Sequence, residues 1–245
     1  MRNVLLLLLF IAVFAFTKVS FCINGGSFMF GLGLRGTGPV TTESRTASGF
    51  HAIDLDMSGD VEISVSDQYA VTVSAQGNLL PYIKTEVVEG ELRIFCERPI
   101  RSSEGIVIKV AAPAFDALVV GGSGTIRTQT PLHASQMQMS VAGSGDIFLN
   151  AATLQKARCD ISGSGVIHLG GTADEVDSSI AGSGGVAAKD MVINRLTASI
   201  SGSGDVEAQV VHNLKADISG SGTVRYSGQP AVESSVSGSG AVERM

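Results

Sequence analysis

Aliphatic and polar residues alternate through the C-terminal half of the chain, in segments that each carry a Gly-Ser-Gly triplet. The triplet occurs seven times, at steps of 21, 20, 19, 20, 18 and 18 residues. Its paired glycines are Gly122 and Gly124, Gly143 and Gly145, Gly163 and Gly165, Gly182 and Gly184, Gly202 and Gly204, Gly220 and Gly222, and Gly238 and Gly240. A repeat of about 20 residues with this regularity is typical of a solenoid.

The positions that flank the triplet are uniformly β-branched and aliphatic. Two residues before it stand Val120, Val141, Ile161, Ile180, Ile200, Ile218 and Val236, and two after it Ile126, Ile147, Ile167, Val186, Val206, Val224 and Val242. Mostly polar residues fill the intervening positions, which is the pattern of a strand with one buried face. Each repeat is therefore predicted to contain a strand of about six residues, a Gly-Ser-Gly corner, a short second strand and a polar return, such as 190–194 or 226–230.

These repeats predict an all-β, single-chain parallel β-helix, because one coil cannot bury its apolar side and stacked coils can. Seven coils at about 4.8 Å each would give a rod of roughly 35 Å. The glycines are expected at the corners, where they permit backbone angles that a Cβ penalises. The triplet serines should form a column, inward or outward, that hydrogen-bonds the turns. A stripe of hydroxyls that contacts sugars is the alternative.

The segment before the regular repeats also alternates, with looser spacing. Runs such as 53–57, 61–65 and 106–110 indicate β-strands that are separated by turns. We interpret 43–112 as irregular opening coils or a cap of the solenoid, and 113–245 as the regular β-helix. An independent small β-domain over the first of these ranges is the alternative.

The first 22 residues resemble a secretory signal peptide. Arg2 precedes thirteen uninterrupted apolar residues, Val4 to Phe16, which suits a signal core and is short for a membrane span. An uncleaved anchor is the alternative. Cys22 is a candidate for lipidation, but Phe21 before it is larger than lipoprotein signals usually carry, so plain cleavage near Thr17 or Cys22 also stands. The glycine-rich 23–42 is expected to be a tether.

The amino-acid composition limits the classes of partner that we expect the protein to bind. The chain has 17 basic and 23 acidic residues, a net charge of −6, and no basic stripe, which argues against nucleic acid. Tryptophan is absent and tyrosine occurs three times, so few flat side chains such as Phe148 and Tyr226 are available to contact sugars.

Candidate chemistry is sparse. Asp146 and Asp205 share an offset from the triplet but lie three coils apart, roughly 14 Å, as do Asp160 and Asp217. Another acidic group is Asp174, Glu175 and Asp177, which we interpret as a solvated loop, with a cation site as the alternative. His51, His133, His168 and His212 share no short spacing, and are expected at the surface. Cys96 and Cys159 are expected in the core as free thiols, with a disulfide as the alternative. No catalytic, metal or cofactor site is predicted.

The residues also resemble a known family of the bacterial envelope, over about 40–245. The matching features are the signal-like start, Gly49-Phe50 with Ile53, Gly77-Asn78-Leu79-Leu80, Gly90-Glu91-Leu92-Arg93-Ile94, the Pro113 segment and the serial triplets. The family is described as a putative auto-transporter adhesin, head GIN domain. The resemblance implies a right-handed parallel β-helix, exported to the periplasm or the cell surface, and it brings no catalytic residues. Many members resemble lipoproteins, from which Phe21 departs here.

Together these features favour a non-catalytic, exported β-helix protein of the cell envelope, with an adhesive or structural role. Its expected partner is a surface ligand or an envelope component, and the membrane would be met only through an N-terminal anchor. A self-associating envelope module, paired end to end through its last coil, is the second hypothesis. A carbohydrate-active β-helix enzyme is the third.

Overall fold

The computed structural model describes residues 33–245, which form one compact unit. The N-terminal half contains β1 (Leu34–Arg35), β2 (Val40–Arg45), β3 (Ala52–Asp56), β4 (Asp60–Val65), β5 (Ala70–Gln76), the 3₁₀ turn η1 (Leu80–Tyr82), β6 (Ile83–Val88), β7 (Glu91–Cys96), β8 (Ile100–Arg101) and β9 (Val107–Ala112). The repeats contain β10 (Ala117–Val120), β11 (Thr125–Thr128), β12 (Leu132–Gly143), β13 (Asp146–Gly163), β14 (Val166–Gly182), β15 (Gly185–Gly202), β16 (Asp205–Gly220), β17 (Thr223–Ser227), β18 (Ala231–Gly238) and β19 (Ala241–Arg244). Cys22 and the predicted signal peptide lie outside the described residues.

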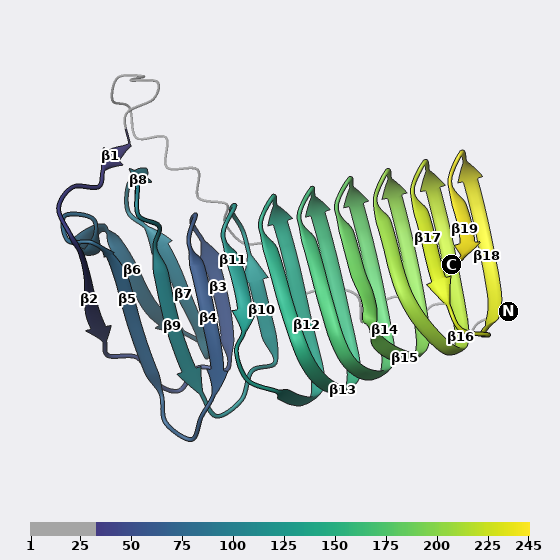
Figure 1. Ribbon diagram of the computed structural model, residues 1–245, viewed down its shortest axis with the longest axis horizontal. Helices are drawn as coiled ribbons and strands as arrows, with labels where there is room; N and C mark the ends of the chain where they lie inside the picture. The colour runs from purple at the N-terminus through teal and green to yellow at the C-terminus, as the bar shows by residue number, and fades with distance from the viewer. Residues whose placement is uncertain (1–32) are drawn as a thin grey trace, which may run out of the picture. The chain divides into compact units, whose positions relative to one another are not determined.

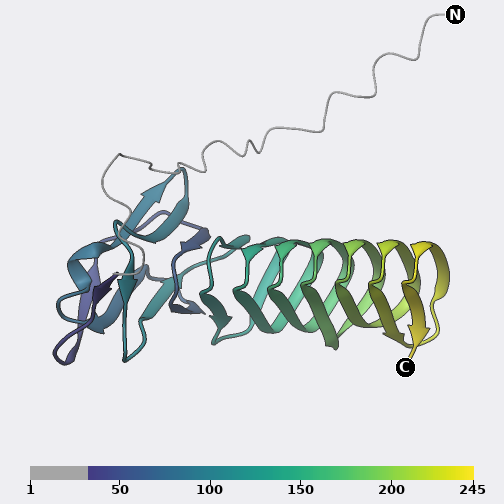
Figure 2. The ribbon, with the colours of Figure 1, turned by 90° about the horizontal axis from the view of Figure 1, so that it is seen from above.

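The repeats stack as a parallel β-solenoid, so the predicted fold class is confirmed. The first glycine of one triplet faces that of the next, as in Gly163↔Gly182↔Gly202. Figure 1 shows the long strands bending around the bottom of the solenoid, and Figure 2 shows the successive coils side by side. The identical register of every corner is what makes the ladder of coils regular.

The β13 and β15 coils are each three straight segments, because the inward–outward alternation breaks twice between corners. In β13 the buried residues are Ile147, Leu149, Ala152, Leu154, Ala157, Cys159 and Ile161. Two consecutive outward residues, at 150–151 and again at 155–156, mark the bends. The segments are 146–149 after the corner, 152–154 in the middle and 157–161 before the next corner. We call their outer surfaces the post-corner, middle and pre-corner faces.

The predicted short second strand and polar return are therefore wrong for the central coils. Residues 190–194 lie within β15, a single strand of 18 residues. The segment stays extended because it hydrogen-bonds to a coil on each side, and bulges absorb the bends. The unequal steps along the chain are absorbed there too, since the register of β15 on β16 shifts between Ala188 and Val192.

The corner glycines lie where a side chain would collide with the coil below. A Cβ on Gly182 would lie 2.5 Å from the carbonyl oxygen of Gly163, and its φ is +133°. The triplet serines point outward and are exposed. Their backbone N–H groups, rather than their hydroxyls, bind the preceding corner, as Ser183 N–H does to the Gly163 carbonyl at 2.9 Å.

The N-terminal half extends the same solenoid, but the spatial order of its coils differs from their order in the chain. The β3–β4 coil pairs with β10–β11 on one side and with β7 and β9 on the other. Antiparallel strands then close this end: β6 on β7, β5 on β9 and β2 on β5. These strands share one hydrophobic core with the repeats, so 43–112 is not a separate domain.

The tether expected over 23–42 extends too far. Within the described part of that range, β1 pairs with β8, and β2 begins at Val40 and pairs with β5. Thr41 and Thr42 are β-branched and lie opposite Ala75 and Ser74 of β5, so they add to a sheet edge. Each described strand pairs with another strand of 33–245.

Candidate binding surface

The inward side chains of the solenoid are almost all apolar, with Thr128 and Ser178 as buried polar exceptions in the repeats, so candidate function lies on its three outward faces. Ile161, Ile180 and Ile200 are each at most 2% exposed. Cys159 is buried and Cys96 is half-buried, and both are free thiols. Burial raises the pKa of Cys159 to about 12 and that of Cys96 to about 11, which leaves both thiols protonated at neutral pH.

The post-corner face carries a stack of three side chains from successive coils. The Arg127 guanidinium lies 3.8 Å from the centroid of the Phe148 ring. On the opposite side, the Phe148 and His168 rings are 4.2 Å apart and within 3° of parallel. Their strands are in register, Arg127↔Phe148↔His168, so the strand spacing sets the ring spacing. This face therefore presents a cation–π and aromatic stack on a rigid sheet.

The same ladder continues on both sides of the stack with ion pairs. Glu62 contacts Lys109 at 3.4 Å, and Arg225 donates to Glu207 at 3.1 Å. Between His168 and Glu207 the ladder position is Ala187, which carries only a methyl group. The ladder thus has one gap, directly beside the His168 ring.

His168 is held toward its neutral form. Its pKa is lowered from the ordinary value chiefly by partial burial and further by the Arg127 guanidinium, while Asp146 opposes the shift. Asp146 itself accepts a hydrogen bond from the Val166 N–H at 2.9 Å. A neutral imidazole offers a flat, uncharged ring to whatever lies against it.

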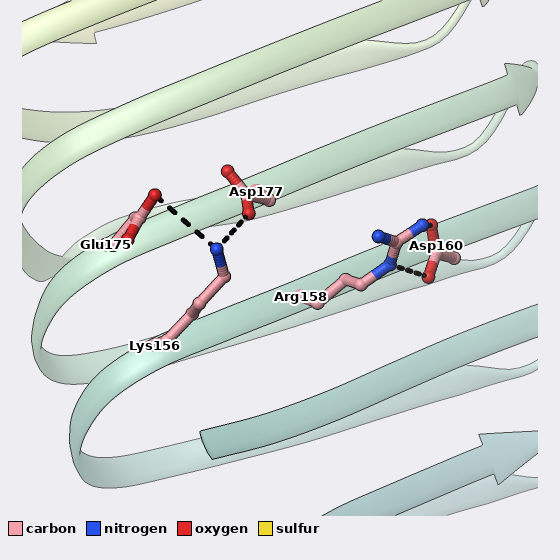
Figure 3. Close-up of polar contacts among 5 residues, drawn as sticks. All are labelled: Lys156, Arg158, Asp160, Glu175 and Asp177. Atoms are coloured by element: carbon pink, nitrogen blue, oxygen red, sulfur yellow. Dashed lines mark hydrogen bonds and ion pairs between the residues drawn. The ribbon is translucent and has the colours of Figure 1, made fainter. Parts of the chain in front are cut away.

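The pre-corner face carries paired charges (Figure 3). Lys156 contacts Asp177 at 2.8 Å and Glu175 at 3.5 Å, and Arg158 pairs with Asp160 at 2.8 Å. The hydrogen bond to Asp177 is the main cause of the raised pKa of Lys156. These groups neutralise one another on an exposed surface, where each pair contributes little to stability.

The acidic loop expected at 174–177 is wrong, because a bend divides it between two faces. Glu175 and Asp177 bind Lys156 on the pre-corner face. Asp174 accepts a hydrogen bond from the Asn194 side chain at 2.9 Å on the middle face. In residues 33–245, no three His, Cys, Asp or Glu side chains come together as a metal-binding group.

Two shallow grooves run across the coils. The groove on the middle face has a volume of about 510 Å³ and is lined by His133, Thr153, Thr172 and Val192 from four successive coils, together with their neighbours. The groove on the pre-corner face is about 340 Å³ and is lined largely by serines. Both are open and repetitive, as expected for a surface that is made by stacking equivalent positions.

The sequence reasoning placed Phe148 outward but missed its stacking partners. The signal was present, since Arg127, Phe148 and His168 all stand three residues after a triplet. His51, the remaining histidine with a partner, pairs with Asp116 at 2.8 Å. The register places Asp146 and Asp205 three strands apart, so they do not form a site together.

Solved structures share this architecture. A protein from Bacteroides fragilis, described as a putative adhesin, is 21% identical, and the match covers 87% of this chain and 100% of that one with a TM-score of 0.80. A Parabacteroides distasonis protein, described as a putative lipid binding protein, is 26% identical over 86% and 99% of the two chains with a TM-score of 0.74. A second protein from that species, a putative adhesin, is 27% identical over the same shares with a TM-score of 0.69.

No curated protein matches the chain. Among the residues that the structure covers, no helix is long and apolar enough to cross a membrane. The family model described as "Putative auto-transporter adhesin, head GIN domain" matches residues 49–230, which span both the N-terminal coils and the triplet repeats. The family resemblance noted from the residues is thereby confirmed, and the chain belongs to the "Putative auto-transporter adhesin, head GIN domain" family.

Proposed function

We propose that this protein is exported to the bacterial envelope and acts there as a non-catalytic adhesin, binding a surface ligand through the outside of its β-helix. Three things support the proposal: the family description, the signal-like first 22 residues, and the adhesin descriptions of its structural relatives. Lipidation at Cys22 or plain cleavage would both be compatible with it.

The observation that carries the proposal is the form of the outward faces. They offer long, open grooves and side-chain ladders that repeat at the strand spacing. Such a surface suits an extended ligand that is held by many weak contacts, because it buries area along its length without enclosing the ligand. The charged groups on the pre-corner face are already engaged with each other.

Protease treatment of intact cells of the native host tests the proposal. Peptides from 33–245 should be released from intact cells, while a periplasmic marker protein stays protected. Mass analysis of the mature N-terminus would then distinguish an acylated Cys22 from a cleaved chain. Protection of the whole chain until the outer membrane is opened would contradict surface display, and with it the adhesive role.

A second candidate function, self-association, is favoured by the last coil. Val232 and Val236 face the same side as the buried Leu214 and Ile218, yet they are 42% and 43% exposed. The edge of β18 faces away from its neighbour β16. Because antiparallel strands close the other end, two copies would meet through their β18 edges, tail to tail.

Light scattering at increasing concentration tests this pairing. The expected result is a rise from monomer to dimer mass that is abolished by Val236→Lys. The control is Val192→Lys, which changes a similarly exposed valine on the middle face and should leave the dimer intact. A monomer mass throughout would refute self-association and leave the adhesive proposal unaffected.

A further inference from the structure

The gap in the post-corner ladder is the feature of the described surface that is shaped for a specific ligand. Arg127, Phe148 and His168 are stacked, and Glu207 is paired with Arg225. At Ala187, between these two groups, a methyl group takes the place of a long side chain. One face of the His168 ring is covered by Phe148, and the other looks across Ala187 toward Glu207.

The width of the gap matches one ring. His168 and Glu207 are two strands apart, so their backbones are separated by about 9.6 Å. A ring that makes van der Waals contact on both sides needs about 7–8 Å. Of the two neighbouring outward positions of the same strand, Gly185 has no side chain and Lys189, at the bend, has a long exposed one, so the floor is open on the Gly185 side. The two walls belong to a continuous parallel sheet, which holds the gap open before a ligand arrives.

The two walls differ in chemistry. The His168 wall is a flat, largely uncharged ring, whereas the opposite wall is the Glu207 carboxylate, whose Oε1 is held by Arg225. Asp205 lies outward beside it, next to Gly185 in the register. A ligand that fits must therefore be apolar on one face and carry hydrogen-bond donors at its edge. A purely aromatic ring would cover a carboxylate without giving it a donor, which is costly.

We propose that the space over Ala187 is a binding slot for a single pyranose ring of a glycan. The C–H face of the sugar would stack on His168, and its hydroxyls would donate to Glu207 and Asp205. The assignment rests on the proposed adhesive function and deepens it by naming the ligand class. Neighbouring sugars of the same glycan would extend along the outside of the coils.

The test is binding of methyl glycosides and their disaccharides to the purified protein, monitored by saturation-transfer NMR. We expect transfer from the protein to at least one glycoside, with a dissociation constant on the order of 1 mM, because one exposed ring buries little surface. Ala187→Phe should weaken that binding by about tenfold or more, since the new ring fills the slot and extends the stack. Glu207→Gln should weaken it by about fivefold, because a charged acceptor is lost.

The matched control is Ala142→Phe, which places the same side chain at an outward alanine on the pre-corner face. It should bind glycosides as the unmodified protein does, and both variants should show the same melting temperature within error. The proposal is overturned if no glycoside receives saturation, if Ala187→Phe binds as well as Ala142→Phe, or if indole binds the slot and glycosides do not.

These outcomes separate the slot from the adhesive function. If cells that carry Ala187→Phe still adhere like unmodified cells, adhesion does not depend on the slot, and the adhesive function itself stands. If the purified protein binds glycosides but is fully protected from protease on intact cells, the binding slot is supported and the adhesive function is refuted.

Discussion

Gly182→Ala should destabilise the solenoid strongly, because it adds one carbon where two backbones already touch. The new Cβ would lie 2.5 Å from the Gly163 carbonyl oxygen and 3.2 Å from the Gly163 nitrogen. Both are backbone atoms within the ladder, so neither can move without disturbing a coil. The residue also has φ of +133°, which an L side chain rarely adopts.

The magnitude follows from these two costs. Overpacking against backbone costs about 1–3 kcal/mol, and holding a residue with a side chain at an unfavourable φ costs about 1–3 kcal/mol. Their sum is an expected loss of about 2–6 kcal/mol in the free energy of unfolding. For a domain of this size, that corresponds to a fall in melting temperature of roughly 4–24 °C.

Two further glycines separate the contributions. Gly204 has no positive φ, but its Cβ would lie 2.6 Å from the Gly184 oxygen and 2.6 Å from Ile180 Cγ2, so Gly204→Ala tests crowding alone. Gly105 has φ of +80° and nothing within 4 Å, so Gly105→Ala tests the backbone angle alone. The expected order of destabilisation is Gly182, then Gly204, then Gly105 at about 1 kcal/mol.

Urea unfolding followed by circular dichroism gives the free energies, and hydrogen exchange locates the damage. Solenoids can open coil by coil, so faster exchange should appear in β13 to β15 for Gly182→Ala. An effect within about 0.5 kcal/mol of the unmodified protein, the size of an ordinary surface substitution, would refute the role given to the corner. Equal losses from Gly182→Ala and Gly105→Ala would refute the claim that close approach of the coils matters.

Three further predictions concern the core and the titratable groups. Burial, together with the nearby negative charges of Glu91 and Asp56, raises the pKa of Asp54 from the ordinary 3.8 to about 6. Ionisation of this carboxyl is unfavourable in the folded state, so the protein loses stability as the pH rises from about 4 to about 6. Asp54→Asn should therefore stabilise the protein at neutral pH by about 1 kcal/mol, discounted for partial exposure, and not at pH below about 4; melting curves at several pH values check this, and equal gains at all pH values would contradict it. Cys159 should resist iodoacetamide in the folded protein while the half-buried Cys96 reacts slowly, as read by mass spectrometry, and equal labelling would contradict their placement. Ile200→Ala in a central coil should cost about 2–5 kcal/mol in urea unfolding, whereas Val232→Ala in the exposed last coil should cost under about 1 kcal/mol, and similar costs would show that the last coil is covered.

The regular coils could be predicted because their determinants are local. A β-branched residue two positions on either side of Gly-Ser-Gly is enough to set the corner and the inward face, and Val141 and Ile147 lie inward as expected. The N-terminal coils could not be ordered in the same way. β3 lies between β7 and β10, and nothing in its alternation tells which strands will become its neighbours. Such pairings depend on contacts between distant segments.

The aromatic stack was hidden for a related reason. Arg127, Phe148 and His168 are separated by about 20 residues, and their steps of 21 and 20 differ from the later steps of 18. Only the register shows that the difference is absorbed at the middle bends, so that positions after the corner stay aligned. The ladder can be recognised in the sequence only when positions are counted from each triplet and not at a fixed period.

Inward, corner and outward positions of a coil have different roles, and only the outward positions are free to vary binding specificity. Most inward positions must stay apolar to fill the core, and the corner glycines must stay without a side chain to let the coils approach. The third position after each triplet neither fills the core nor forms the corner. In successive coils it carries Arg127, Phe148, His168, Ala187 and Glu207. A substitution there changes what the surface offers without changing how the coil stacks. Because each such residue contacts only its neighbours in the ladder, one alanine is enough to turn a continuous stack into a slot.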